Sequence, residues 1–322
     1  MKILIFIDEL SSSPTKDEED TLQEANEVRA SLIKFGHEVF IASFNLNLYE
    51  NLKTIDIIKP NLIFNLVETF NKGNTLHIAP LIFEQKQIKF SGGSSFALFI
   101  TSNKILTKDF LKGINIKTPS FYYSNIGIIN PILIEEKVII KPIDEEASCG
   151  IDDNSVTLFD NYKMIKSYIK NNPSNFIENY IKGDEYSISV MKINSKVVIL
   201  PIAKMEFINY PNEKPKILNY KSKWDESSYE YKNTQRVFID ETKDSPLFKE
   251  MKSICKKCYK KLGSKGYLRI DFKVDKNNIP YVIDININPC ITHDSGFVAA
   301  ANKYGLTYDE LINTIINEAI NE

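Results

Sequence analysis

The sequence lacks an excess of charge of either sign: its 322 residues carry 40 basic and 42 acidic side chains, for a net charge of −2. A chain so balanced has no electrostatic basis for binding nucleic acid or an anionic membrane surface, so small-molecule partners are expected. Long apolar runs are lacking too. MKILIFID is cut off by Asp8 and Glu9, and no later run has the length of a membrane span. We therefore expect a soluble, cytoplasmic protein with neither a nucleic-acid nor a membrane partner.

Cysteine and histidine are also scarce. Four cysteines are too few for a disulfide scaffold in a chain of this size. Cys255 and Cys258 form a CxxC pair, but the surrounding KEMKSICKKCYKKL has the pattern of an amphipathic helix. No second pair and no histidine cluster completes a zinc site. We interpret both cysteines as core residues of a helix.

The first part of the chain alternates between apolar runs and helical patterns. KILIFID, HEVFIA and NLIFNLVE are predicted strands, and residues 18–35 carry apolar side chains at helical spacing up to Gly36. Strands that alternate with helices favour a parallel, doubly wound α/β layer. We assign this first domain to residues 1–95.

The rest of the chain has a mixed α+β pattern, which we divide into residues 96–182 and residues 183–322. Predicted strands are KVIIKP, VTLF, FIENYI, the antiparallel pair EYSISVM and KVVILPIA, YLRIDFKV and YVIDIN. Predicted helices cover residues 101–114, 160–171, 244–262, 294–304 and 307–319. Residues 209–236 are polar with few apolar positions, which is typical of a long functional loop.

The strongest chemical signal is the strand pair YLRIDFKV and YVIDININP. Asp271 shares a strand face with Arg269, and Asp284 shares one with Asn286, because side chains two apart point the same way. Carboxylates on core strands cost several kcal/mol unless they are paired or bind a cation. The three oxygen side chains of Asp271, Asp284 and Asn286 suit Mg²⁺. A structural Arg–Asp bridge within the sheet is the alternative.

Three lysines occupy positions that suit phosphate binding. Lys104 opens a helix, Lys141 ends the strand KVIIKP, and Lys223 lies in the polar stretch. A lysine at the end of a buried strand is a plausible phosphate partner, whereas most lysines are solvated surface groups. The small residues of the following loop, EEASCGI, would let backbone N–H groups approach a phosphate, although many loops contain serine and glycine.

Two acids flank a turn in IENYIKGDEYSI. Glu178 lies within the first strand-like segment and Glu185 just after Gly183. Acids so placed are able to accept hydrogen bonds from an adenine amino group and a ribose hydroxyl. The alternative is a charged hairpin turn with no ligand.

The order of these signals along the chain resembles the ATP-grasp superfamily and, within it, the D-alanine–D-alanine ligase family. The resemblance covers nearly the whole chain, through FNLVE, SGGSS, KILTKDFLKGINIKTP, IIKP, IENYIKGDEYSISV and GYLRIDF. Its most specific part is RIDFKV…YVIDININP with DSGFVAAANKYGLTYDELI behind it. The implied fold has three α/β and α+β subdomains, with ATP between the central and C-terminal ones. On this basis residues 1–95 are the N-terminal α/β (preATP-grasp) domain, 96–182 the central ATP-grasp subdomain and 183–322 the C-terminal one with the magnesium site.

The resemblance also implies a role for each motif residue. The lysines Lys104, Lys141 and Lys223 would contact ATP phosphates, under a loop that contains Ser148 and Gly150. Glu178 and Glu185 would hold adenine and ribose, beside Tyr180 and Ile181. The metal ligands would be Asp271, Asp284 and Asn286, holding two Mg²⁺ ions, with Mn²⁺ as an alternative. Arg269 would stabilise the charged intermediate, and Trp224 would pack beside Lys223. The substrate positions would be Glu68, Arg269, Cys290 and Ser295.

The implied reaction is ATP-dependent, ADP-forming amide-bond formation through an acyl-phosphate. A carboxylate attacks the γ-phosphate and an amine then attacks the acyl-phosphate, with the oxyanion stabilised near Arg269 and residues 288–291. Residues 209–236 would act as a lid that excludes water. The catalytic residues would be Arg269, Lys223 and Ser148, and the assembly a homodimer through the first domain.

Four departures from the family pattern concern metal, loop and substrate positions. Asp284 stands where glutamate is usual, the loop EEASCGI lacks a glycine and looks like an EDAS-type loop, Glu68-Thr69 replaces a His-Gly pair, and Cys290 replaces a glycine. We therefore hypothesise amino-acid or peptide substrates other than two D-alanines, with Glu68 and either Asp17 or Glu18 holding an ammonium unless these acids are merely solvated.

Three alternatives stay open. The first is a true D-alanine–D-alanine ligase of peptidoglycan synthesis. The second is a ligase that extends a carrier-bound or peptide substrate, docked near His293, Asp294 and Ser295. The third is a degenerate ATP-binding regulatory protein without catalysis, against which the Mg²⁺-type ligands argue.

Overall fold

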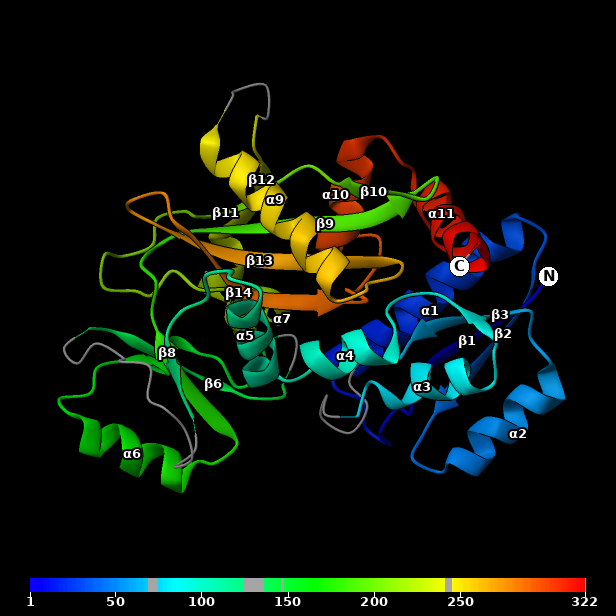
Figure 1. Ribbon diagram of the computed structural model, residues 1–322, viewed down its shortest axis with the longest axis horizontal. Helices are drawn as coiled ribbons and strands as arrows, with labels where there is room; N and C mark the ends of the chain where they lie inside the picture. The colour runs from blue at the N-terminus through cyan, green and yellow to red at the C-terminus, as the bar shows by residue number, and fades with distance from the viewer. Residues whose placement is uncertain (69–74, 124–135, 146–147, 241–244, 322) are drawn as a thin grey trace.

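The computed structural model describes residues 1–68, 75–123, 136–145, 148–240 and 245–321, apart from the side chain of Asp17. Its strands form three sheets, which succeed one another along the chain (Figure 1). Each of the three predicted domain ranges contains one of the sheets. The boundaries between the domains stay a prediction.

The N-terminal sheet is parallel, with the order β2-β1-β3-β4. Its strands are β1 (Lys2–Asp8), β2 (Glu38–Phe44), β3 (Leu62–Leu66) and β4 (Lys89–Phe90). The helices between them are α1 (Lys16–Lys34), α2 (Leu48–Ile58) and α3 (Ile78–Gln85). Residues 3–8 are all buried, which is the pattern of a strand covered on both faces. The predicted doubly wound α/β layer is therefore confirmed, and Gly36, with a φ of 77°, follows α1 as expected.

The central sheet is small and antiparallel, with the order β5-β8-β6-β7. Its strands are β5 (Phe121–Tyr122), β6 (Val138–Pro142), β7 (Val156–Thr157) and β8 (Asn175–Asn179). Helices α4 (Ser95–Thr101), α5 (Lys104–Gly113) and α6 (Tyr162–Asn171) and the 3₁₀ helix η1 (Asp153–Ser155) belong to this part of the chain. The side chain of Asn103 accepts hydrogen bonds from two N–H groups of the first turn of α5, which begins the helix at Lys104.

The C-terminal sheet has the order β12-β11-β9-β13-β14, with β10 paired to β9. Its strands are β9 (Gly183–Ile193), β10 (Lys196–Ile199), β11 (Ala203–Phe207), β12 (Thr234–Phe238), β13 (Tyr267–Asp275) and β14 (Pro280–Ile287). Helices in this part are α7 (Tyr220–Trp224), α8 (Tyr229–Lys232), α9 (Pro246–Lys261), α10 (Gly296–Tyr304) and α11 (Tyr308–Asn321). Figure 1 shows α9 crossing one face of this sheet, while α11 lies on the side of the N-terminal sheet and contacts α1.

The prediction of a long loop over residues 209–236 is wrong in part. The segment contains α7, α8 and the first residues of β12, where Thr234–Phe238 pair with β11. The side chains of Asn219 and Ser228 cap the two helices. These caps are local helix signals, but the prediction relied on the low apolar content of the segment and did not use them. The segment is therefore a structured cover rather than an irregular loop.

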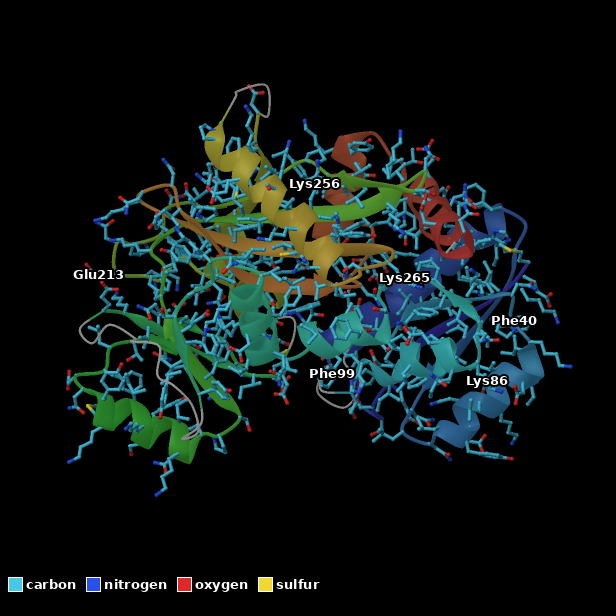
Figure 2. All side chains as sticks on the ribbon, viewed as in Figure 1. Phe40, Lys86, Phe99, Glu213, Lys256 and Lys265 are labelled. Atoms are coloured by element: carbon cyan, nitrogen blue, oxygen red, sulfur yellow. The ribbon has the colours of Figure 1, made fainter. Side chains whose placement is uncertain are left out.

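The hydrophobic core is continuous between the N-terminal and C-terminal sheets. One buried cluster joins Phe6 and Phe83 of the first layer to Ile270 and Cys255 of the last. Cys255 and Cys258 are fully buried on α9, as predicted for core residues of a helix. Lysines such as Lys86, Lys256 and Lys265, labelled in Figure 2, are exposed. No helix of the described ranges has both the length and the apolar character needed to cross a membrane.

Candidate active site

A cavity of about 640 Å³ gathers the predicted site residues from all three parts of the chain. Every predicted site residue except Gly150 lines it: Glu68, Lys104, Lys141, Ser148, Glu178, Tyr180, Ile181, Glu185, Lys223, Arg269, Asp271, Asp284, Asn286, Cys290 and Ser295. The lysines and the oxygen side chains from distant parts of the sequence therefore share one cavity. A cavity of this size is typical of a small-molecule site.

A buried charge network lies where the central sheet meets α5. Glu178 on β8 forms ion pairs with Lys141 on β6, at 2.6 Å, and with Lys108 on α5. Burial would raise the pKa of Glu178, but the two lysines outweigh it and hold that pKa below its usual value. Burial likewise lowers the pKa of Lys108, which Glu178 opposes. Both carboxylate oxygens of Glu178 thus have a lysine partner, and the expected contact with adenine stays a prediction.

The loop after β6 contacts residues 209–236, which we call the polar cover. Ser148 has a φ of 64° and donates a hydrogen bond from its hydroxyl to the carbonyl of Leu218, at 2.9 Å. Lys104 donates to the carbonyl of Glu145, at 2.5 Å, so the first residue of α5 holds the start of the same loop. Glu146 and Ala147 of the predicted phosphate loop lie outside the described residues.

Gly150 has a conformational role in this loop and does not line the cavity. Its φ is 71°, and a Cβ there would lie 2.9 Å from Cγ of Pro142. A residue with a side chain would therefore be strained at this turn. Gly150 thus belongs to the predicted loop, and its expected part in nucleotide binding stays a prediction.

Tyr180, Ile181 and Glu185, which are predicted to bind the nucleotide, line one end of the cavity. Oε2 of Glu185 lies 2.8 Å from Nζ of Lys273, whose ammonium also donates to the carbonyl of Lys216, at 2.6 Å. The hydroxyl of Tyr180 accepts a hydrogen bond from the backbone N–H of Lys216. Glu185 is thus fixed in place at the wall of the cavity, as a residue that positions a ligand must be.

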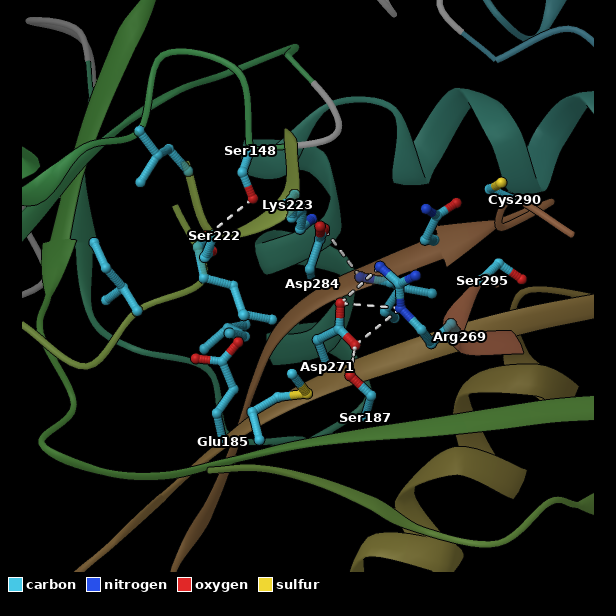
Figure 3. A pocket seen from close by; sticks show the side chains of 18 of the residues that line it. Ser148, Glu185, Ser187, Ser222, Lys223, Arg269, Asp271, Asp284, Cys290 and Ser295 are labelled. Carbon is cyan, nitrogen blue, oxygen red and sulfur yellow. Dashed lines mark hydrogen bonds and ion pairs between the residues drawn. The ribbon is translucent and has the colours of Figure 1, made fainter. Parts of the chain in front are cut away.

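The floor of the cavity is formed by the facing strands β13 and β14. Asp271 pairs in register with Asp284, and Arg269 with Asn286, so the four residues form two cross-strand pairs. Figure 3 shows Arg269, Asp271 and Asp284 close together on this floor. Arg269 donates hydrogen bonds to both oxygens of Asp271, at 3.0 to 3.2 Å, and Ser187 donates to Oδ1 at 2.6 Å. Burial would raise the pKa of Asp271, but Arg269 and Ser187 together keep it below its usual value. The carboxylate is therefore ionised near neutral pH.

The structural Arg–Asp bridge considered as an alternative is present, and it coexists with the cavity. Both oxygens of Asp271 accept hydrogen bonds from Arg269, while Oδ1 of Asp284 accepts from the N–H of Ile285 at 3.1 Å. Within the described ranges, no group of three or more His, Cys, Asp or Glu side chains is arranged to hold a metal ion. The predicted set has two carboxylates and one amide oxygen, so it fits only an ion that keeps water or phosphate ligands, as Mg²⁺ does.

Lys223 extends from α7 toward this floor (Figure 3). Burial and the neighbouring Arg269 lower the pKa of Lys223, while Asp271 and Asp284 oppose the change. The side chain of Trp224 also lines the cavity. Residues 209–236 thus bring a cation into the cavity, and the predicted contact of Lys223 with a phosphate stays a prediction.

Arg236 is a cavity residue that the sequence did not indicate. It lies on β12, and its guanidinium is 3.3 Å from the position that a Cβ on Gly296 would take at the start of α10. Arg236 falls within residues 209–236, which the sequence predicted to be a loop, and no sequence motif surrounds it. The alternation of polar and apolar residues in TQRVF was the one sequence signal of a strand at this position.

The substrate end of the cavity is acidic. Sγ of Cys290 lies 3.4 Å from Oδ2 of Asp20, and the backbone N–H of Glu68 donates to Asp8 at 2.9 Å. Burial, reinforced by nearby carboxylates, raises the pKa of the Cys290 thiol well above its usual value. Ser295 caps α10 by accepting from the N–H of Val298. In Figure 3 Cys290 and Ser295 lie beyond Arg269, on the side away from Glu185.

Two contacts at this end bear on the predictions. Glu18 does not line the cavity: its carboxylate accepts hydrogen bonds from Ser11 and Thr15 in a capping box that begins α1. In the 288–291 loop, predicted near the oxyanion, the N–H of Ile291 donates to Oε1 of Glu24 at 2.6 Å, and the role of that loop stays a prediction. Glu24 was missed because it sits mid-helix among charged residues. Thr69 and the side chain of Asp17 lie outside the described part of the chain.

Comparison with known proteins agrees with this architecture. The family described as "D-ala D-ala ligase C-terminus" matches residues 134–317. A D-alanine–D-alanine ligase from Carboxydothermus hydrogenoformans is 26% identical, covering 98% of this chain and 97% of the relative. An uncharacterised protein, y4sG, from Sinorhizobium fredii is 24% identical, covering 92% and 87%.

A solved structure supports the fold. The D-alanine–D-alanine ligase from Bacillus anthracis, complexed with ATP, superposes with a TM-score of 0.73 at 21% identity, covering 100% of this chain and 98% of that one. The predicted ATP-grasp fold is therefore confirmed. With more than half of its length matched by the family's C-terminal region, this chain belongs to the D-alanine–D-alanine ligase family of ATP-grasp enzymes, which are ATP-dependent, ADP-forming carbon–nitrogen ligases.

Proposed function

We propose that this ligase joins the carboxylate of one amino acid or short peptide to the amine of another, and that the pair is not two D-alanines. One observation carries the proposal: the cavity whose floor holds Arg269 and Asp271 continues into an end lined by Asp20, Glu68 and Cys290. A substrate with only a methyl side chain offers this acidic lining neither a hydrogen-bond donor nor a positive charge. The acidic end therefore favours a substrate with further polar atoms.

The nucleotide is assigned to the opposite end. Lys104 and Lys141 would contact its phosphates, Ser148 would close over them from the loop after β6, and Glu185 would hold the ribose beside Tyr180 and Ile181. Support comes from their shared cavity and from the ATP complex of the Bacillus anthracis relative. Two more cations serve the reaction: Lys223 would neutralise the transferring phosphoryl group from the cover, and Arg269 would hold the attacking carboxylate.

Mg²⁺ would be held by Asp271, Asp284 and Asn286, with Mn²⁺ as an alternative. These side chains supply hard oxygen donors on one floor, although Asp284 is one methylene shorter than the glutamate usual in the family. When bound, the metal would supply charge neutralisation on the phosphoryl oxygens. Arg269 would meanwhile keep Asp271 ionised, as its lowered pKa indicates.

The polar cover, residues 209–236, would exclude water from the acyl-phosphate. It is tied to the central part by Ser148 and Leu218, and to α1 by Lys16, which donates to the carbonyl of Trp224 at 3.0 Å. A cover anchored on both sides suits a reaction whose intermediate hydrolyses in water.

A panel of D- and L-amino acids and dipeptides tests the proposal, with ATP and Mg²⁺ present. Phosphate and ADP release would be measured together with the mass of each product. We expect the fastest amide product to contain at least one component other than D-alanine. Formation of D-alanyl-D-alanine as fast as any other product would refute the substrate proposal and favour the second candidate, a D-alanine–D-alanine ligase like the named relatives.

A further inference from the structure

A buried lysine, Lys273, lies at the end of the cavity that contains Glu185. It follows Arg269 and Asp271 at intervals of two along β13, and all three side chains line the cavity. Lys273 is only 5% exposed, and its register partner on the neighbouring strand β9 is Glu185. None of the roles predicted from the sequence involves Lys273, and the proposed ligase chemistry does not use it.

The ammonium of Lys273 occupies one of the two carboxylate oxygens of Glu185. Its Nζ lies 2.8 Å from Oε2, and within the described ranges this is the only ion pair of either residue. In the same part of the chain Oε1 of Glu185 has no hydrogen-bond donor, and Glu185 lines the cavity. One oxygen is therefore held by the protein, while the other is free to accept a hydrogen bond from a ligand.

The same ammonium also holds the polar cover. It donates a hydrogen bond to the carbonyl of Lys216 at 2.6 Å, while the N–H of Lys216 donates to the hydroxyl of Tyr180 at 3.1 Å. Both backbone groups of one cover residue are thus bound to the cavity wall. Nζ of Lys273 also lies 5.5 Å from the centre of the Phe207 ring, a cation–π contact that helps to fix the ammonium. A single charged group therefore joins Glu185 to the cover.

We infer that Lys273 is a positioning residue that couples recognition of the nucleotide sugar by Glu185 to closure of the polar cover. A ribose hydroxyl that donates to Oε1 polarises the carboxylate and fixes it against Lys273, which in turn holds the carbonyl of Lys216. A nucleotide without that hydroxyl leaves Glu185 with one contact, so the cover is held less firmly. The inference rests on the proposed function, which places the ribose beside Glu185.

Hydrogen exchange of the native protein tests the coupling without a variant. Exchange of the backbone amides of residues 214–218 would be measured with saturating ATP, with saturating 2′,3′-dideoxy-ATP and without nucleotide, each with Mg²⁺. We expect ATP to slow this exchange by about tenfold or more relative to the dideoxy nucleotide, the effect of one hydrogen bond to a charged group. Equal protection by the two nucleotides would overturn the inference.

Two variants and a control then separate Lys273 from Glu185. Lys273→Met removes the ammonium, whereas Glu185→Gln removes the charge that a ribose hydroxyl would meet and keeps an oxygen that accepts from Lys273. Lys276→Met is the matched control, because it removes a lysine from the same hairpin at an exposed position outside the cavity. Calorimetry would give the ratio of the Kd values for 2′,3′-dideoxy-ATP and ATP. ADP release would be compared with amide product for the best substrate pair of the panel.

We expect a Kd ratio of about tenfold or more in the native protein and in Lys276→Met, and a ratio near unity in Lys273→Met and Glu185→Gln. Lys273→Met should also release more ADP than amide product, because a loosened cover admits water to the acyl-phosphate. The native protein and Lys276→Met should release the two in equal amounts.

The outcomes distinguish the inference from the proposed function. A native Kd ratio near unity would refute the placement of the ribose beside Glu185, and the inference with it. A native ratio that Lys273→Met retains, or ADP release by Lys273→Met that matches its amide product, would overturn the inference alone. Absence of ADP release by the native protein would count against the ligase function, whereas the Kd ratios need no turnover. If Lys273→Met fails to fold, the exchange measurement on the native protein decides.

Discussion

Replacing Glu178 by glutamine tests whether this buried acid organises the nucleotide end or only touches the base. Glu178 is 1% exposed and pairs with Lys108, 2% exposed, and with Lys141, 12% exposed. The substitution leaves two ammonium groups facing a neutral amide. Removing one partner of a buried ion pair costs about 3–5 kcal/mol, because the remaining charge stays desolvated.

We expect Glu178→Gln to reduce the free energy of unfolding by about 3–5 kcal/mol. Lys108→Met should cost less, because Glu178 keeps its pair with Lys141 at 2.6 Å. Combining both changes should then cost less than the sum, because Lys108→Met removes one of the two ammonium groups that Glu178→Gln leaves without a partner. Urea unfolding of the three variants measures these differences.

The same variants distinguish the two roles of Glu178. Loss of ATP affinity in Glu178→Gln without any change in the urea midpoint would contradict our reasoning and favour a direct contact with adenine. Loss of stability with retained affinity per folded molecule would assign Glu178 to positioning Lys141. Binding of a fluorescent ATP analogue, measured below the unfolding midpoint, supplies the affinity.

Three further changes follow from single contacts. Arg269→Gln should abolish ADP release and lower stability by about 3 kcal/mol, because it leaves a desolvated carboxylate; a coupled ADP assay and thermal unfolding report both. Gly183→Ala would put a Cβ 1.8 Å from the carbonyl oxygen of Val274, and should cost about 1–3 kcal/mol in urea, whereas Gly113→Ala meets nothing within 4 Å and should not destabilise. Glu18→Ala breaks the capping box of α1 and should lower stability by about 0.5–1 kcal/mol, with ADP release unchanged.

The secondary structure was largely predictable because local signals decided it. KILIFID is apolar throughout and became a strand buried on both faces, while Gly36 and Asn103 supplied the helix end and the helix start. The cavity floor was predictable for a similar reason. Alternation on YLRIDFKV and YVIDIN fixed which side chains share a face, and antiparallel pairing then set Asp271 opposite Asp284.

What escaped the sequence depends on contacts between segments. Lys108 lies four residues after Lys104 in a helix rich in lysine, and only the approach of β8 to α5 buries it against Glu178. Glu24 looks like one more charged residue of an amphipathic helix until the loop after β14 covers it. Arg236 was hidden within a polar stretch whose strand pairs with β11. Tertiary contacts, rather than propensity, decide such positions.

The acids at the substrate end should also leave a signature in the stability of the protein without ligand. Burial raises the pKa of Glu24 above its unfolded value, from 4.5 to about 8. Between these values the folded state holds more protons than the unfolded state, so this group makes stability fall as pH rises. The slope is roughly 1.4 kcal/mol per pH unit for each proton retained.

Glu24→Gln removes that proton and should therefore flatten the decline. Its unfolding free energy should match the native value near pH 5 and exceed it increasingly up to pH 8, whereas Glu19→Gln, at an exposed position of the same helix, should follow the native slope. Urea unfolding at pH 5, 6, 7 and 8 provides the comparison. If Glu24→Gln loses as much stability between pH 5 and pH 8 as the native protein does, then the carboxyl of Glu24 ionises in the folded protein without an energetic cost. Oε2 of Glu24, which is enclosed in this structure, would then be reached by water.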